Sequence, residues 1–82
     1  MSEWTLYIIE CRDGSLYTGI TTDLKKRLKR HNEGKATKYT RARKPVKLVY
    51  SEEMSSESLA RKREAEIKNM SRTNKLKLIN KR

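Results

Sequence analysis

One stretch of the sequence combines an aromatic ring with closely spaced cations. Residues 35–45 (KATKYTRARKP) contain several basic residues, no acidic one and a single aromatic, and they show neither helical nor strand periodicity. This pattern predicts a surface loop in which Tyr39 stacks on a base or sugar while its neighbours hold phosphates, although an ordinary flexible basic loop fits about equally well. The candidate nucleic-acid-binding residues are Lys38, Tyr39, Arg41, Arg43 and Lys44.

A second group of polar side chains lies on a predicted helix. Thr22 is expected to cap this helix, which stops near Gly34. At about 100° per residue, the inward side would carry Leu24, Arg27, Leu28 and His31. A lone histidine among leucines is more often a core residue than a catalytic one. The arginine beside it weakens that interpretation, because its charge is expensive to desolvate.

Two tyrosines are brought together by a predicted hairpin. Residues 4–11 and 15–21 are predicted strands around a turn. With a three-residue loop and Gly14 in the left-handed conformation, the register gathers the apolar residues on one face. Tyr7 and Tyr17 then share the opposite, less apolar face as diagonal neighbours, roughly 7–8 Å apart at the backbone. Packing between strands would also explain both tyrosines.

A carboxylate could join these side chains from a later helix. The remaining predicted elements are a strand at 46–50, a helix capped by Ser55 or Ser56 that runs to about Met70, and a last helix from Ser71 or Thr73 with Leu76 and Ile79 inward. Glu64 and Glu66 border the apolar stripe of the longer helix about equally well. Periodicity therefore does not choose between the two glutamates.

The composition indicates the class of protein that carries these residues. A chain of 82 residues predicts one domain spanning 1–82, too small for a large enclosed substrate cavity. Lys and Arg number 21 against 10 acidic residues, a net charge of +11, and the excess is concentrated in 23–45 and 61–82. Nucleic acid is the expected partner of such a surface. No apolar run is long enough to span a membrane, which predicts a soluble, cytoplasmic protein.

Taken in order, these motifs resemble the GIY-YIG nuclease domain, and in particular its small stand-alone bacterial branch. The resemblance is carried by Thr5-Leu6-Tyr7, Tyr17-Thr18-Gly19, the run from Asp23 to Leu28, the run from His31 to Gly34, the run from Lys38 to Pro45, and Arg63-Glu64. Each motif is short, but their order and spacing together are specific. The resemblance implies an α+β fold, in which helices flank a three-stranded antiparallel sheet in the order ββαβαα.

The resemblance also implies a reaction, the metal-dependent hydrolysis of a DNA phosphodiester bond. Tyr7 and Tyr17 match the tyrosines of the two motifs, Arg27 the helix arginine, His31 a histidine of some members, and Glu64 the single metal-binding glutamate. Mg²⁺ or Mn²⁺ held by Glu64 would stabilise the leaving oxygen, and Arg27 would bind a non-bridging oxygen. Tyr17 is the leading candidate for the general base, with Tyr7 hydrogen-bonding beside it. His31 is the rival base, because an unperturbed imidazole has a pKa near 6.5.

Two positions depart from the family pattern. Thr5 replaces the glycine of the first motif, and Ile20 stands where many nuclease members carry a lysine, so one phosphate-neutralising charge is missing. Since the sequence shows no added DNA-binding domain, specificity is expected to come from a protein partner or from the shape of the DNA.

Three functions are compatible with these residues. The first is an endonuclease, with branched or damaged DNA as candidate substrates. The second is a non-catalytic DNA- or RNA-binding module that kept the fold, and the third is a basic structural protein, for example one bound to ribosomal RNA. The set Tyr7, Tyr17, Arg27, His31 and Glu64 favours the enzyme, because a pure binding module does not need a carboxylate that repels phosphate. No small-molecule cofactor is expected.

Overall fold

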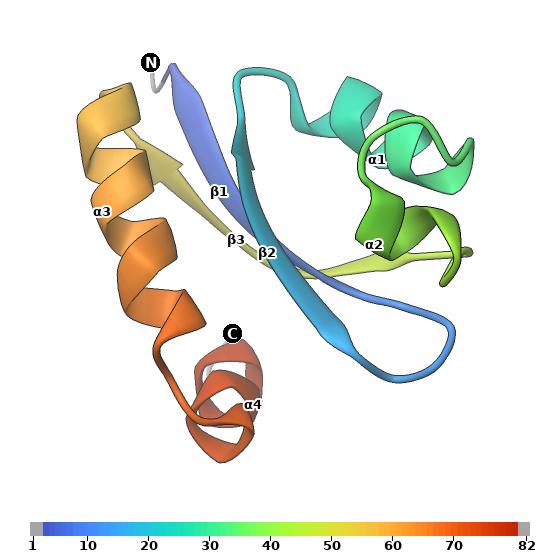
Figure 1. Ribbon diagram of the computed structural model, residues 1–82. Helices are drawn as coiled ribbons and strands as arrows, with labels where there is room; N and C mark the ends of the chain where they lie inside the picture. The colour runs from blue at the N-terminus through green and yellow to red at the C-terminus, as the bar shows by residue number, and fades with distance from the viewer. Residues whose placement is uncertain (1–2, 81–82) are drawn as a thin grey trace.

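The computed structural model describes residues 3–80 and contains one three-stranded antiparallel sheet with helices around it (Figure 1). The elements in chain order are β1 (Trp4–Glu10), β2 (Leu16–Thr21), α1 (Leu24–Asn32), α2 (Lys38–Arg41), β3 (Lys47–Met54), α3 (Glu57–Lys68) and α4 (Arg72–Asn80). The strand order is β2-β1-β3, so β1 is the central strand. The predicted α+β class is confirmed, with the short helix α2 as an addition to the expected order.

The β1–β2 hairpin has the predicted register. Tyr7 pairs with Gly19 and Leu6 with Ile20, which is the pairing that a three-residue loop requires. Gly14 has a φ of 86°, and its N–H donates to the carbonyl oxygen of Cys11 at 2.9 Å. The left-handed conformation at this position favours glycine because a Cβ would strain the backbone. Loop length and hydrophobic alternation thus agree on one register.

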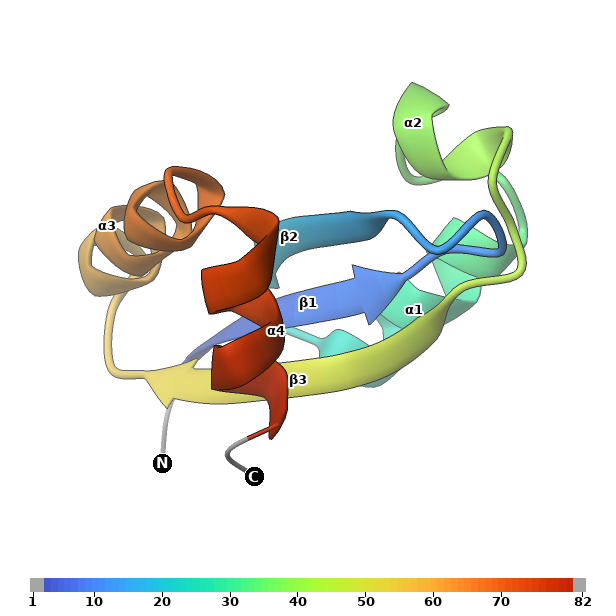
Figure 2. The ribbon, with the colours of Figure 1, turned by 90° about the horizontal axis from the view of Figure 1, so that it is seen from below.

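Helices cover the sheet on both sides, with α1 and α2 on one and α3 and α4 on the other (Figures 1 and 2). Under α1, the buried cluster comprises Tyr7, Ile9, Cys11 and Val46, with Tyr17, Leu24 and Leu28 packed against it. Under α3 and α4, the cluster comprises Leu6, Ile8 and Ile67, and its neighbours include Ile20, Met70, Leu78 and Ile79. The face that carries the two tyrosines is therefore also buried under helices. Alternation in the hairpin had predicted that this face would be the less apolar one.

Side chains set several element boundaries differently from the sequence-based expectation. The cap of α1 is Asp23, whose carboxylate accepts from the Lys26 N–H at 3.1 Å, and not Thr22. The third strand continues past Tyr50 to Met54, because this part of the chain still pairs with β1 as far as Trp4, and Glu52 is ion-paired with Arg63 of α3. Ser56 is the cap of α3, one of the two predicted alternatives.

The segment 35–45 is not an irregular loop throughout, because it contains α2. The Thr37 hydroxyl oxygen accepts from the Thr40 N–H at 3.1 Å and caps this single turn. In α4, Ile79 packs inward as predicted, while Leu78 rather than Leu76 joins it against the core. Among residues 3–80, none of the helices combines the length and apolar character needed to cross a membrane.

Candidate active site

Tyr7 is the buried centre of the candidate site. It lies on the central strand with none of its surface exposed, and its ring passes over Gly19 of β2. A Cβ built on Gly19 would lie 2.5 Å from the Tyr7 hydroxyl oxygen, so only glycine leaves room for this ring. The glycine of the second motif is therefore explained by its close approach to the tyrosine of the first.

Helix α1 contributes two side chains that meet the Tyr7 hydroxyl. The His31 Nε2 atom lies 2.8 Å from the Tyr7 oxygen, and the Arg27 Nε–H donates to the same oxygen at 3.4 Å. The two residues are one helical turn apart, so the inward side predicted for them is the side they occupy. Burial raises the pKa of the Tyr7 hydroxyl above its ordinary value, although the hydrogen bond and charge of Arg27 act in the opposite direction. Tyr7 therefore keeps its proton at neutral pH.

The other ring nitrogen of His31 is bound to a residue that the sequence did not single out. Its Nδ1 atom lies 2.8 Å from the hydroxyl oxygen of Thr40, which is fully buried in α2. Burial of the ring, and then the Arg27 charge, lowers the pKa of His31 to about 4. The pKa near 6.5 that made His31 a rival base is therefore wrong for the folded protein, where the imidazole is neutral at pH 7. No periodic signal marks Thr40, because it faces His31 only once α2 has folded onto α1.

Tyr17 lies beside this cluster on the edge strand. Its ring meets the His31 ring edge-on with the centroids 5.5 Å apart, and it stacks with the Tyr39 ring at 5.8 Å. The Lys68 ammonium nitrogen of α3 lies 6.0 Å from the Tyr17 ring centroid. Side chains of α1, α2 and α3 thus converge on one tyrosine of β2.

The carboxylate of the site comes from α3, and the structure distinguishes the two glutamates that periodicity left open. Glu64 forms an ion pair with Lys68 at 3.4 Å, and its negative charge is among the causes that raise the pKa of Tyr7. Glu66 pairs instead with Arg63 at 3.5 Å and is 54% exposed, against 22% for Glu64. The geometry therefore associates Glu64, and not Glu66, with the tyrosines.

A metal site built on Glu64 would have one protein carboxylate. Among residues 3–80, no group of three or more His, Cys, Asp or Glu side chains could hold an ion. Zinc sites need three or four such ligands, whereas Mg²⁺ keeps several waters and uses one or two carboxylates together with substrate phosphates. The donors present fit a hydrated Mg²⁺ or Mn²⁺ ion that is completed by substrate.

Arg27 also faces two open hollows on the surface. One, of about 350 Å³, is lined by Thr21, Thr22, Asp23, Lys26, Arg27 and Arg30. The other, of about 340 Å³, is lined by Trp4, Ile20, Thr21, Thr22, Arg27, Glu57 and Arg61. Direct contacts join Tyr7, Tyr17, Arg27 and His31, and Glu64 adjoins them through Lys68. The five predicted catalytic residues are thus connected by these contacts, but Arg27 is the one of the five that lines these two hollows.

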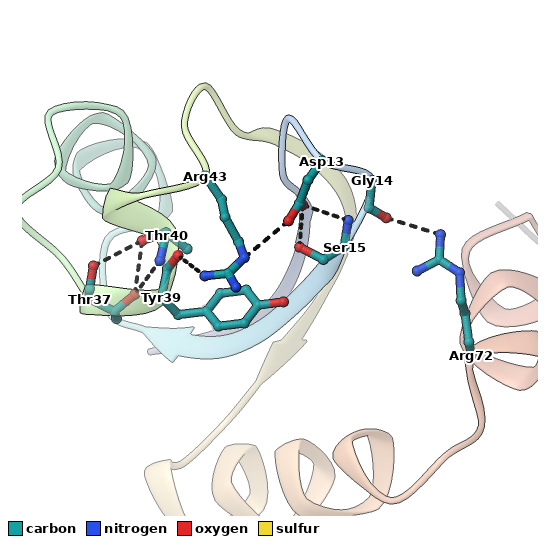
Figure 3. A network of polar contacts seen from close by, with 8 residues as sticks. All are labelled: Asp13, Gly14, Ser15, Thr37, Tyr39, Thr40, Arg43 and Arg72. Atoms are coloured by element: carbon teal, nitrogen blue, oxygen red, sulfur yellow. Dashed lines mark hydrogen bonds and ion pairs between the residues drawn. The ribbon is translucent and has the colours of Figure 1, made fainter.

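The predicted nucleic-acid-binding residues divide into two groups. Arg43 lies over the Tyr39 ring, 4.1 Å from its centroid, and its Nε–H donates to the Asp13 carboxylate at 3.1 Å (Figure 3). Tyr39 and Arg43 are therefore engaged within the protein, where they tie α2 to the hairpin loop. Of the predicted binding residues, the cations that remain exposed are Lys38, Arg41 and Lys44.

The hairpin loop is also fixed from its other side. Arg72 of α4 donates to the carbonyl oxygen of Gly14 at 3.0 Å, and Ser15 donates to Asp13 through its hydroxyl at 2.6 Å (Figure 3). The Arg72 contact connects the start of α4 to the hairpin loop, and the Ser15 contact stabilises the loop just before β2.

Comparison with known proteins identifies relatives over nearly the whole chain. The family model described as the GIY-YIG catalytic domain matches residues 3–77. A UPF0213 protein of Staphylococcus saprophyticus is 53% identical over 79 residues, which is 96% of this chain and 96% of that protein. A UPF0213 protein of Syntrophus aciditrophicus is 55% identical over 80 residues, covering 96% of this chain and 92% of the relative.

Two solved structures have the same fold. The solution NMR structure of a UPF0213 protein from Bacillus halodurans is 45% identical and superimposes with a TM-score of 0.62, covering 94% of this chain and 82% of that one. The NMR structure of a protein from E. faecalis is 37% identical, with a TM-score of 0.61 and coverage of 95% and 83%. The family match, the bacterial relatives and the shared fold agree, and the chain belongs to the GIY-YIG family.

Proposed function

We propose that the protein is a metal-dependent endonuclease that hydrolyses phosphodiester bonds in DNA. The observation that carries the proposal is the convergence of Arg27, two tyrosines and one carboxylate around a fully bonded buried histidine. Burying an imidazole, and partly burying the side chain of an arginine, beside a tyrosine destabilises a small domain unless every partner is present. A site assembled in this way is better suited to chemistry than to packing alone.

Each residue has a distinct role in this proposal. Arg27, whose Nε is held by Tyr7, would direct its remaining N–H groups at a non-bridging phosphate oxygen and neutralise the charge that grows there. Glu64 would hold the metal ion, which when bound supplies positive charge to the leaving oxygen. Tyr17, which is partly exposed at the edge of the cluster, would accept a proton from the attacking water.

Tyr7 and His31 have supporting roles. Both side chains are fully buried, so neither can contact the water molecule that attacks the substrate. Tyr7 would orient Arg27 and His31 would orient Tyr7. Of the five residues, Arg27, Tyr17 and Glu64 would therefore contact the reacting groups.

The exposed cations of the α2 segment would extend the DNA-binding surface. Lys38, Arg41 and Lys44 would hold backbone phosphates, while Tyr39 and Arg43 would shape the segment that presents them. The net charge of +11 favours a polyanionic partner. The proposed location is the cytoplasm. Branched or damaged DNA is included as a candidate substrate, with specificity supplied by DNA shape or by a protein partner.

The alternative is a non-catalytic DNA- or RNA-binding module. It is favoured by Ile20, whose side chain packs with the apolar cluster under α3 and supplies no cation at a position where many nuclease members carry a lysine. Such a module would bind nucleic acid without cleaving it in the presence of Mg²⁺ or Mn²⁺.

Cleavage of supercoiled and branched DNA by the wild-type protein and an arginine variant separates the two functions. We expect nicking in Mg²⁺ or Mn²⁺ that stops with a chelator and falls at least about 100-fold in Arg27→Ala, because one charge-neutralising donor is lost. Lys29→Ala is the matched control, since it removes the same charge from an exposed position of α1 and should leave cleavage within about twofold. Equal cleavage by the two variants would contradict the role of Arg27, and binding without cleavage by every protein would establish the alternative.

A further inference from the structure

A chain of hydrogen bonds links the candidate site to α2 through the interior of the protein. It runs from Arg27 Nε to the Tyr7 hydroxyl, from there to His31 Nε2, and from His31 Nδ1 to the Thr40 hydroxyl. The Thr40 oxygen lies in turn 2.9 Å from the hydroxyl oxygen of Thr37. Tyr7, His31 and Thr40 are all fully buried, so water cannot replace these partners.

The donors and acceptors allow one direction along this chain. Arg27 has only donors, so the Tyr7 oxygen accepts from it. Tyr7 keeps its own proton, and among its described contacts the acceptor for that proton is His31 Nε2. A neutral imidazole that accepts at Nε2 carries its hydrogen on Nδ1, and this N–H donates to Thr40. The Thr40 hydroxyl is therefore the terminal acceptor that the other bonds require.

Without Thr40, the opposite tautomer would disrupt the contact at Arg27. An imidazole with its hydrogen on Nε2 would donate to the Tyr7 oxygen and compete there with the Arg27 Nε–H. The Tyr7 hydroxyl hydrogen would then need another acceptor, and the Tyr7 oxygen would be shared between two donors, which weakens its hold on the guanidinium. Loss of the Thr40 hydroxyl would therefore affect Arg27, to which Thr40 is linked through His31 and Tyr7.

We propose that Thr40 is a positioning residue, which holds His31 in the Nδ1–H tautomer and thereby fixes the Tyr7 hydroxyl as the acceptor that orients Arg27 toward a substrate phosphate. The proposal rests on the proposed function for the identity of the ligand of Arg27. Because Thr40 lies in α2 between Lys38 and Arg41, the same turn that presents phosphate-binding cations also fixes the geometry of the site.

The tautomer of His31 can be measured directly, because this is the single histidine of the chain. In long-range ¹H–¹⁵N correlation spectra at pH 7, we expect a protonated Nδ1 and an unprotonated Nε2 in the wild type and in Thr40→Ser. In Thr40→Val, which keeps the shape but removes the acceptor, this single tautomer should be lost. Thr18→Val controls for burying valine in place of a threonine on the other face of the sheet, and should leave the His31 signals unchanged. An Nε2–H tautomer in the wild type would overturn the proposal. The wild-type spectrum gives this test even if Thr40→Val does not fold.

Cleavage kinetics give the second measurement. We expect kcat to fall about tenfold in Thr40→Val, the effect of losing roughly one net hydrogen bond in the transition state, while KM changes little. Thr40→Ser should restore kcat to within about twofold. An unchanged kcat in a folded Thr40→Val protein whose tautomer has changed would overturn the positioning role. Absence of cleavage by every protein, the wild type included, would count against the proposed function, whereas the spectra would still decide the hydrogen-bond chain.

Discussion

The two faces of the sheet are both buried, but they are built from different kinds of side chain. Under α3 and α4, the buried core consists of Leu6, Ile8 and Ile67, with Thr18 as a buried polar side chain beside Ile8. Under α1 and α2, the same central strand contributes Tyr7 and Ile9, and the buried set also includes His31 and Thr40. Apolar burial is stabilising without special geometry, whereas buried polar groups need every partner in place. The difference indicates that the α3–α4 face mainly holds the fold together, while the α1–α2 face carries the buried polar part of the site, to which α3 contributes Glu64.

The largest stability effect is expected on the apolar face. Ile67→Ala removes a fully buried side chain between Leu6 and Ile8, and should lower the free energy of unfolding by about 2–5 kcal/mol. The cleavage rate per folded molecule should change by no more than about threefold, because Ile67 packs in the apolar cluster with Leu6 and Ile8. Urea unfolding and single-turnover cleavage on the same sample measure both quantities.

Tyr7→Phe is the contrasting variant on the polar face. It retains the ring but leaves His31 Nε2 and Arg27 Nε without their hydroxyl partner, which should lower stability by about 1–3 kcal/mol and the cleavage rate per folded molecule at least tenfold. If Ile67→Ala reduced the rate per folded molecule as much as Tyr7→Phe, the functional division between the two faces would be wrong.

A smaller effect is expected from pH. The pKa of His31 is lowered to about 4 in the folded protein and is about 6.5 in an unfolded chain, so the unfolded state binds more protons between these values. The free energy of unfolding should therefore rise as pH increases from 5 to 6.5 and then level off. Lowered carboxylate pKa values at Asp13 and Glu52 affect stability at lower pH, below this range. Urea unfolding at several pH values should show the rise in the wild type and a flat profile in His31→Gln; equal profiles would contradict burial as the cause.

The sequence predicted the parts of the site that depend on local periodicity. Alternation in the hairpin sets the register that places Tyr7 and Tyr17 on one face, and helical spacing places Arg27 and His31 on the inward side of α1. Both relations follow from the periodicity of the strand and of the helix, so they can be recognised in short stretches of sequence.

The parts that were missed depend on partners far apart in the chain. The third strand runs past its predicted end at Tyr50 to Met54, and Glu52 in this extension pairs with Arg63 of α3. Thr40 became part of the site because a single turn capped by Thr37 folds against His31. Neither relation has a periodic signal, because each depends on how two elements pack.

Comparison of Glu64→Gln with Glu66→Gln in a DNA cleavage assay with Mg²⁺ or Mn²⁺ tests the proposed metal site most directly. Both variants replace a carboxylate of α3 by an amide and change the net charge equally, but only Glu64 adjoins Tyr17 through Lys68. We predict that Glu64→Gln loses metal-dependent cleavage, by about 100-fold or more, while Glu66→Gln cleaves as the wild type does. Cleavage at the wild-type rate by a folded Glu64→Gln protein would contradict a metal-dependent nuclease site built on Glu64.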